Sequence, residues 1–386
     1  MIWNRGRAVL SLAAAMAAGG IFPLTAQAAS PEFSRTEEEW AALRDDTIEY
    51  GELADLIHEY NATVQNNAYE YRKFREDYGD TNAEVSSAYY DLAQDFYSDI
   101  SGDDDAGSMM NDLNLEIQGD SMMKQADETL EDSKIYQLTY EQAEKSLVVT
   151  AQSYMISYYQ QLLEQEQQQA ELANAGNEYE LTRTKLAAGT ATQLDMLAAQ
   201  EAVQTAQNQI SQLENTIEET RESLIVLLGW KHDDHPVIGA VPEIDLSRIE
   251  GMNPDQDLET AIANNYTLQI NKRKLENARN QTTKESLRAA IANNERQIGA
   301  SLSSAYQSVL TAKTAYEQAQ AAAALEEENT RVAALRLSAG MMTQAAYDEQ
   351  VNARDNSQLS AQSAGLELLT AMENYEWAVA GLAAAE

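Results

Sequence analysis

The sequence predicts an all-α fold in which two tandem repeats each form a long helical hairpin, and three observations support this prediction. First, the 386 residues include five Pro, and residues 32–235 and 255–386 contain none. Proline is the residue that helix interiors tolerate least, so both stretches can form long helices. Second, two short motifs recur along the chain, which is typical of a duplicated unit. Third, apolar residues recur at alternating spacings of three and four, as in a coiled coil.

Composition excludes several classes of protein. The chain carries 63 acidic and 26 basic side chains, which give a formal net charge of −37. Nucleic-acid phosphates need a basic face, so we do not expect the chain to bind nucleic acid. The absence of Cys excludes disulfide bonds, thiolate metal sites and cysteine nucleophiles. With 44% hydrophobic residues, the chain is too apolar to be a disordered acidic tail.

The first 28 residues have the pattern of an export signal. Arg5 and Arg7 form a basic start, residues 8–24 are mostly apolar, and Ala26-Gln27-Ala28 is the small-residue pattern that a signal peptidase reads. The alternative is an uncleaved membrane anchor, but the apolar run is short and is interrupted by Pro23. We therefore predict a signal peptide over residues 1–28 and an exported protein of the periplasm or cell envelope.

Self-comparison of the chain identifies the repeated unit. Residues 185–193 and 336–344 share the pattern basic-Leu-x-Ala-Gly-x-x-Thr-Gln and lie 151 residues apart. Residues 61–67 and 265–271 also match, at an offset of 204. The first copy is therefore longer by about 53 residues between these marks, and the extra length lies between 68 and 153. We predict a first helical repeat over 29–229, a linker over 230–257 and a second helical repeat over 258–386.

The linker is recognised by its composition. Residues 230–257 hold Pro236, Pro242 and Pro254, which end regular structure. They also contain His232-Asp233-Asp234-His235, and His and Asp are metal ligands. Their spacing matches no strong metal motif, so we predict a solvated loop here, with no metal and no cofactor.

A coiled-coil seam follows Gly189. Apolar or small residues recur there in steps of three and four, which predicts one buried face on a long helix. Gly189 and Gly340 each lie between two long helical stretches, so we predict that each marks the turn of a helical hairpin. The helix before Gly340 is expected to begin near Asp257, with a reversal at residues 280–284. The seam consists of Val203, Ala206, Ile210, Leu213, Ile217, Thr220, Leu224 and Leu227.

These features resemble the TolC family of outer membrane efflux proteins. Two tandem copies, each with a hairpin tip that carries a basic residue, a Gly and a following Thr, are similar to this family over about residues 40–386. The strongest local match is residues 194–200, directly after the first tip. The resemblance implies a homotrimer that forms an α-helical tunnel in the periplasm, associated with the outer membrane. It also implies that the tips contact a periplasmic adaptor protein linked to an inner-membrane pump.

The resemblance can be carried to individual tip residues. The family usually has a Val before the tip Gly, whereas this chain has Ala188 and Ala339. If the helices enclose a lumen, Asp195, Asp348 and Glu349 are candidates for rings of carboxylates that attract cations. The alternative for these acids is an ordinary solvated helix face. The residues expected to contact an adaptor are Lys185, Leu186, Gly189, Thr192, Gln193, Arg336, Leu337, Gly340, Thr343 and Gln344.

One part of the family pattern is missing. Each copy in the family also supplies two strands to an outer-membrane β-barrel, and such a strand needs about 9–11 residues of alternating polarity. Residues 265–340 have a helical pattern throughout, and residues 91–132 hold 13 acids and one Lys. We therefore predict that the β-barrel strands are absent or vestigial. The acidic insertion 91–132 is expected to be a solvated loop, because blocks of like charge repel and stay hydrated.

Two functions remain open from the sequence. The first is an exported tunnel or docking component of a tripartite efflux or secretion system. The alternative is a non-transporting extracytoplasmic coiled-coil scaffold derived from a TolC-like ancestor. We do not expect an enzyme, because the sequence has no His clustered with Ser, no Gly-rich phosphate loop and no spaced set of metal ligands.

Overall fold

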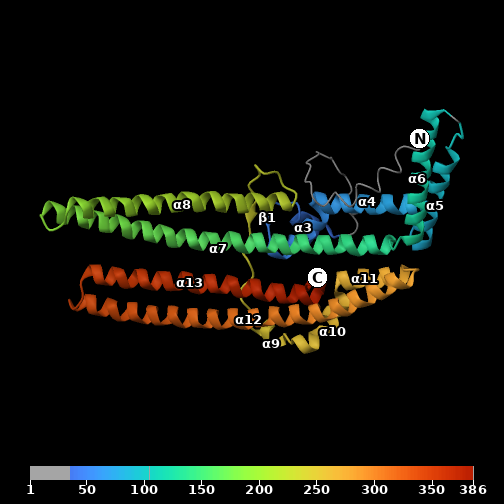
Figure 1. Cartoon of the computed structure of the whole chain (residues 1–386). Helices are drawn as coiled ribbons and strands as arrows, with labels where there is room; N and C mark the ends of the chain where they lie inside the picture. Colours follow the sequence, from blue (N-terminus) through green and yellow to red (C-terminus); the bar gives the residue numbers. More distant parts are fainter. Residues whose placement is uncertain (1–34, 104, 386) are drawn as a thin grey trace. The chain divides into compact units, whose positions relative to one another are not determined.

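Long helices make up most of the computed structural model, which describes residues 35–103 and 105–385 (Figure 1). The predicted signal peptide, residues 1–28, lies outside these described residues. The predicted all-α class is confirmed. In chain order the helical elements are α2 (Glu37–Ala42), η3 (Tyr50–Glu52), α3 (Leu53–Tyr60), α4 (Ala62–Tyr78), α5 (Asn82–Ser98), α6 (Ala106–Glu128), α7 (Ser133–Ala187), α8 (Gln193–Leu227), α9 (Ser247–Gly251), α10 (Pro254–Asn264), α11 (Tyr266–Asn277), α12 (Gln281–Ser338), α13 (Gln344–Trp377) and η4 (Ala378–Leu382).

The two longest helical hairpins are α7 with α8 and α12 with α13, and in each the two helices pack side by side (Figure 1). The predicted seam on α8 is confirmed. Among residues 201–220, every seam position is buried or partly buried, and every other residue is exposed. A narrow stripe of small and medium apolar side chains therefore holds α8 against α7, as in a coiled coil.

The second repeat contains the predicted reversal and one additional break. Helix α11 ends at Asn277, and Asn280 caps α12 by accepting a hydrogen bond from the Thr283 amide at 2.7 Å. Helix α11 then packs against α12, as expected for a reversal. A break at Asn265, where α10 and α11 meet, was not predicted from the sequence. Asn265 has an extended backbone and accepts a hydrogen bond from the Leu268 amide at 3.0 Å, so it starts a new helix.

Each repeat has its own hydrophobic core. In the first repeat, side chains of α3, α7 and α8 pack around Leu56, Met155 and Leu224, which are fully buried. In the second repeat, side chains of α10 to α13 pack around Leu302 and Met372, which are also fully buried. Burial of a side chain of this size contributes about 2 kcal/mol, so the cores are the main source of stability.

Polar contacts join the two repeats. Trp377 at the end of α13 donates its indole N–H to Gln152 Oε1 of α7 at 2.6 Å. Arg273 of α11 donates to Asp132 Oδ2 at 2.6 Å, and Asp132 is fully buried at the N-cap of α7. The charge of Asp132 is therefore paired across the boundary between the repeats, as a buried carboxylate requires.

The prediction of a solvated loop over residues 91–132 is wrong for most of that segment and is met only by the exposed residues 99–103. Helices α5 and α6 pack antiparallel over most of this segment, and residues 99–105 connect them (Figure 1). Acidic residues take part in the hairpin instead of opposing it. The Tyr97 hydroxyl donates to Asp120 Oδ1 at 2.6 Å. Asp105 caps α6 by accepting hydrogen bonds from the amides of Gly107 and Ser108.

The linker joins the repeats along a short pair of strands. Strand β2 (Val237–Ile238) pairs in parallel with β1 (Thr47–Ile48). The Tyr159 hydroxyl of α7 lies 3.0 Å from the carbonyl oxygens of both Ile238 and Gly239, to which it can donate. In the part of the chain that the structure describes, none of the helices is both long enough and apolar enough to cross a membrane.

Candidate functional site

The first hairpin tip is closed by backbone hydrogen bonds around Gly189. Helix α7 ends at Ala187, and Gly189 has a φ of 74°, a left-handed conformation that favours glycine. The Gly189 amide donates to the Leu186 carbonyl at 3.0 Å, and the Thr190 amide donates to the Lys185 carbonyl at 2.8 Å. This pair of bonds is the Schellman motif, which satisfies the last carbonyl groups of a helix.

The second tip repeats this geometry. Gly340 has a φ of 70°, its amide donates to the Leu337 carbonyl at 3.0 Å, and the Met341 amide donates to the Arg336 carbonyl at 2.8 Å. The predicted hairpin turns at Gly189 and Gly340 are therefore confirmed. The repeated pattern of a basic residue, Leu and Gly marks the end of a helix, where a cation also interacts favourably with the helix dipole.

The Thr of each motif begins the following helix. The Thr192 hydroxyl accepts a hydrogen bond from the Asp195 amide at 3.2 Å, and the Asp195 carboxylate accepts from the Thr192 amide at 2.7 Å. This capping box lowers the pKa of Asp195, chiefly through the hydrogen bond from the Thr192 backbone. In the second tip, Thr343 caps α13 by accepting from the Ala346 amide at 3.2 Å. Ala346 has no carboxylate, so the reciprocal bond is absent there.

The structure gives the three candidate lumen acids different environments. Asp195 is engaged in the capping box of α8. Asp348 Oδ1 accepts a hydrogen bond from Gln344 Nε2 at 2.7 Å, one turn away on α13. Glu349 is exposed next to it. Asp195 belongs to one hairpin and the other two acids belong to the other hairpin, and all three are solvated.

Both tips lie at the same end of the long hairpins (Figure 1). Near this end Asn352 Nδ2 of α13 donates to Asn174 Oδ1 of α7 at 2.9 Å, which ties the two hairpins together. Gln193 and Gln344 are exposed at the first position of α8 and α13. Lys185 pairs with Glu178 at 3.8 Å. The predicted tip residues therefore gather into two similar turns on adjacent hairpins.

Large exposed apolar side chains at the tips were not predicted from the sequence. Leu194 is 74% exposed, Leu197 is 61% exposed and Met341 is 78% exposed. The signal was present in the sequence, because Leu194 and Leu197 fall outside the spacing of the seam that begins at Val203. An apolar residue off the seam of an otherwise regular coiled coil has no partner within its own hairpin.

A second repeated feature, also missed, closes each repeat at the opposite end. Asn61 Nδ2 donates to the Leu227 carbonyl at 2.7 Å, and Asn265 Nδ2 donates to the Gly381 carbonyl at 3.2 Å. Gly229 and Gly381 both have positive φ, and each backbone lies so close to the residue before the Asn that a Cβ would overlap it. Asn61 and Asn265 therefore have the same two roles. Each caps the helix that follows it, and each holds the end of the last helix of its own repeat.

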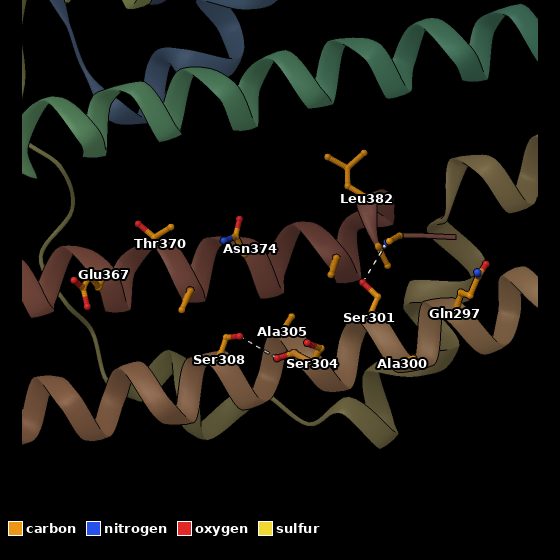
Figure 2. A pocket seen from close by; sticks show the side chains of 14 residues that line it. Gln297, Ala300, Ser301, Ser304, Ala305, Ser308, Glu367, Thr370, Asn374 and Leu382 are labelled. Carbon is orange, nitrogen blue, oxygen red and sulfur yellow. Dashed lines mark hydrogen bonds between the residues drawn. The ribbon is translucent and has the colours of Figure 1, made fainter. Parts of the chain in front are cut away.

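A groove of about 740 Å³ lies between α12 and α13 in the second repeat (Figure 2). Small and polar side chains line it, and the Ser308 hydroxyl donates to the Ser304 carbonyl at 3.1 Å. Glu367 is the one ionisable residue among those that line the groove. A single carboxylate without a second titratable group does not form an acid–base pair. The other polar lining residues include Ser301, Thr370 and Asn374.

The linker histidines lie in an exposed setting. His232 Nδ1 is 3.9 Å from Asp233 Oδ1, and both side chains are exposed. Within residues 35–103 and 105–385, we find no group of three or more His, Cys, Asp or Glu residues that could hold a metal ion.

The folded chain is thus an all-α protein of two tandem helical-hairpin repeats with matching tips. Residues 80–230 match the family model described as outer membrane efflux protein, and the predicted resemblance to the TolC family of outer membrane efflux proteins is confirmed. The fold is similar to that of a membrane protein from Pseudomonas aeruginosa, with a TM-score of 0.54 and 14% identity over 86% of this chain and 90% of that one. It is also similar to the outer-membrane channel OprN, with a TM-score of 0.51 and 14% identity over 94% of this chain and 98% of that one. A search of curated protein sequences finds no match.

Proposed function

We propose that this chain is an exported tunnel component of a tripartite efflux or secretion system, and that its hairpin tips dock on a periplasmic adaptor protein. The family match over residues 80–230 supports an efflux role. The single observation that carries the docking proposal is the matching geometry of the two tips. Two turns of the same conformation, one in each repeat, present equivalent surfaces to a partner.

The tips carry groups suited to a protein partner. Leu194, Leu197 and Met341 are exposed, and large exposed apolar side chains grouped at one place mark interaction sites. Lys185 and Arg336 add cationic side chains in the last turns of α7 and α12. An adaptor that contacts the tips would bury the apolar side chains and pair with the cations.

The proposed tunnel is a homotrimer, in which each chain contributes its two long hairpins to the wall. The net charge of −37 would give such a tunnel a strongly negative potential. A lumen with this potential concentrates cations and favours basic or cationic substrates. Asp195 on α8 and the neighbouring Asp348 and Glu349 on α13 are the exposed acids proposed to face that lumen.

A cross-linking experiment in cells tests the docking proposal. A photoreactive residue is placed at Gln193 or Gln344 at the tips, and at Gln209 as a matched exposed position in the middle of α8. We expect adducts with an adaptor protein, identified by mass spectrometry, from the two tip positions and none from Gln209. Docking would be refuted if the protein forms trimers in the envelope but gives equal adducts at all three positions. It would also be refuted if such a protein gives no adducts at the tips.

A transport assay separates the tunnel from the scaffold. Cells that lack this chain should accumulate a cationic dye, and the wild-type chain should restore its export. The variant Gly340→Pro should not restore export, because proline cannot adopt a φ of 70° and the tip must change. Unchanged dye export in cells without the chain would instead favour the non-transporting scaffold.

A further inference from the structure

The acidic hairpin α5–α6 carries an apolar stripe that its own packing does not use. Met109, Leu113 and Ile117 follow each other at spacings of four on α6, and Met110 lies three residues before Leu113, so all four share one helix face. Their exposed fractions are 60%, 52%, 57% and 63% in that order. The packed face of α6 lies on the other side, where Gly119 and Ala126 are buried.

The hairpin holds α6 rigidly, so the stripe is presented on an ordered helix. The Tyr97 hydroxyl donates to Asp120 at 2.6 Å, and the Ser86 hydroxyl donates to the Ala126 carbonyl at 2.7 Å. At the connecting end, the amides of Ser101 and Gly102 donate to the Asp112 carboxylate at 3.0 and 2.9 Å. These bonds fix α6 against α5 along most of its length.

The charge around the stripe identifies the kind of partner. Residues 82–128 hold 12 acidic side chains and one Lys, which is a net charge of −11. Glu116 and Asp120 lie directly beside the stripe on α6. A second copy of the hairpin would bring two such charges together, and an anionic lipid surface would also be repelled. The complementary partner combines an apolar stripe with positive charge.

We propose that the exposed face of α6 binds a basic amphipathic helix of another protein. The apolar side of that helix covers Met110, Leu113 and Ile117, and its Lys or Arg side chains pair with the flanking carboxylates. Pairing of an amphipathic helix with an apolar helix face is a common mode of recognition, and charge complementarity increases its rate and specificity. This site is separate from the hairpin tips, so it does not depend on the adaptor proposal.

A binding assay on the full-length exported chain tests the inference. The probe is a fluorescent peptide of Lys and Leu whose sequence forms an amphipathic helix. A scrambled peptide of the same composition controls for charge alone. This control is needed because the whole chain is acidic and attracts any basic peptide. We expect the amphipathic peptide to bind more tightly than the scrambled one in fluorescence anisotropy. We expect the double variant Leu113→Gln with Ile117→Gln to weaken that binding roughly thirty-fold. The reason is that two half-exposed apolar side chains can no longer be buried in the contact.

A matched double variant and two further outcomes make the test decisive. Val226→Gln with Leu325→Gln removes two apolar side chains that are 52% and 59% exposed elsewhere on the chain, and it should leave binding unchanged. Equal affinity of the wild type and the Leu113/Ile117 variant would overturn the proposal. So would a change of oligomeric state in that variant, since the stripe would then bind a second copy. If the wild type cosediments with phosphatidylglycerol vesicles and the Leu113/Ile117 variant does not, the stripe binds a membrane surface instead.

Discussion

Replacing Asn265 with Ala should destabilise the protein by about 3 kcal/mol. The Asn265 side chain is 1% exposed and caps α11 through the Leu268 amide, a contribution of about 1 kcal/mol. It also donates to the carbonyls of Gly381 at 3.2 Å and Ala383 at 2.9 Å. Each buried hydrogen bond of this kind contributes about 1 kcal/mol, and two carbonyl groups lose their donor when it is removed.

Asn280→Ala is the matched control for this substitution. Asn280 caps α12 through the Thr283 amide at 2.7 Å, but its side chain is exposed and has no second role in closing the repeat. Its removal should cost about 1 kcal/mol. Urea unfolding followed by far-UV circular dichroism, at one protein concentration to hold any association fixed, measures both losses. Equal losses in the two variants would refute the assignment of Asn265 as the residue that holds the end of the last helix.

Two further predictions concern the α5–α6 hairpin and the first tip. Gly119→Ala should lower the free energy of unfolding by about 1 kcal/mol, because the new Cβ would lie 2.5 Å from Tyr97 Cε1. Gly176→Ala should raise the free energy of unfolding by about 1 kcal/mol, because a Cβ there meets open space and Ala favours the helix more than Gly does. Urea unfolding distinguishes these opposite signs, and a gain in both variants would contradict the contact. Asp195 has a lowered pKa in the folded chain, so its stabilisation is complete above the ordinary value of 3.8 and is lost as pH falls through the folded pKa. The difference in stability between the wild type and Asp195→Asn should therefore shrink in acid, and a difference independent of pH would exclude the capping box as its source.

Patterns of local spacing predicted the features that depend on neighbouring residues. The seam of α8 and the turns at Gly189 and Gly340 depend on residues a few positions apart, so their spacing is visible in the sequence. The break at Asn265 depends on carbonyl groups 116 and 118 residues away. No local pattern shows such partners, although the match between Asn61 and Asn265 marked both positions as special.

The acidic hairpin shows why charge composition was misleading. Counting 13 acids in residues 91–132 predicted repulsion and a solvated loop. In the structure Asp127 and Asp120 accept hydrogen bonds from Tyr90 and Tyr97, which lie 37 and 23 residues earlier. Hydrogen bonding to Asp120 raises the pKa of Tyr97 to about 12, as expected for a phenol that donates to a carboxylate. The neutral Tyr hydroxyl groups of α5 therefore stabilise carboxylates of α6 that the charge count treated only as repelling one another.

The hairpin α5–α6 is an insertion into an otherwise repeated connection, and its deletion is the last prediction. In the second repeat, residues 278–280 alone join α11 to α12. In the first repeat the ends of the insertion meet, because the Ser133 amide donates to the Asp80 carbonyl at 3.2 Å. Joining Thr81 directly to Glu131 should therefore leave a short turn of five residues, 79–81 followed by 131–132, where the second repeat has a turn of three.

The expected cost of this deletion is small. It removes two hydrogen bonds to the second repeat, from Asn277 to the Leu130 carbonyl at 2.7 Å and from Arg279 to the Ala126 carbonyl at 2.9 Å. At about 1 kcal/mol each, the free energy of unfolding should fall by about 2 kcal/mol, with one cooperative urea transition and unchanged helicity per residue. Loss of cooperative unfolding would show that the hairpin is part of the core. A folded deletion variant that no longer binds the basic amphipathic peptide, with docking at the tips retained, would separate the two surfaces of this protein.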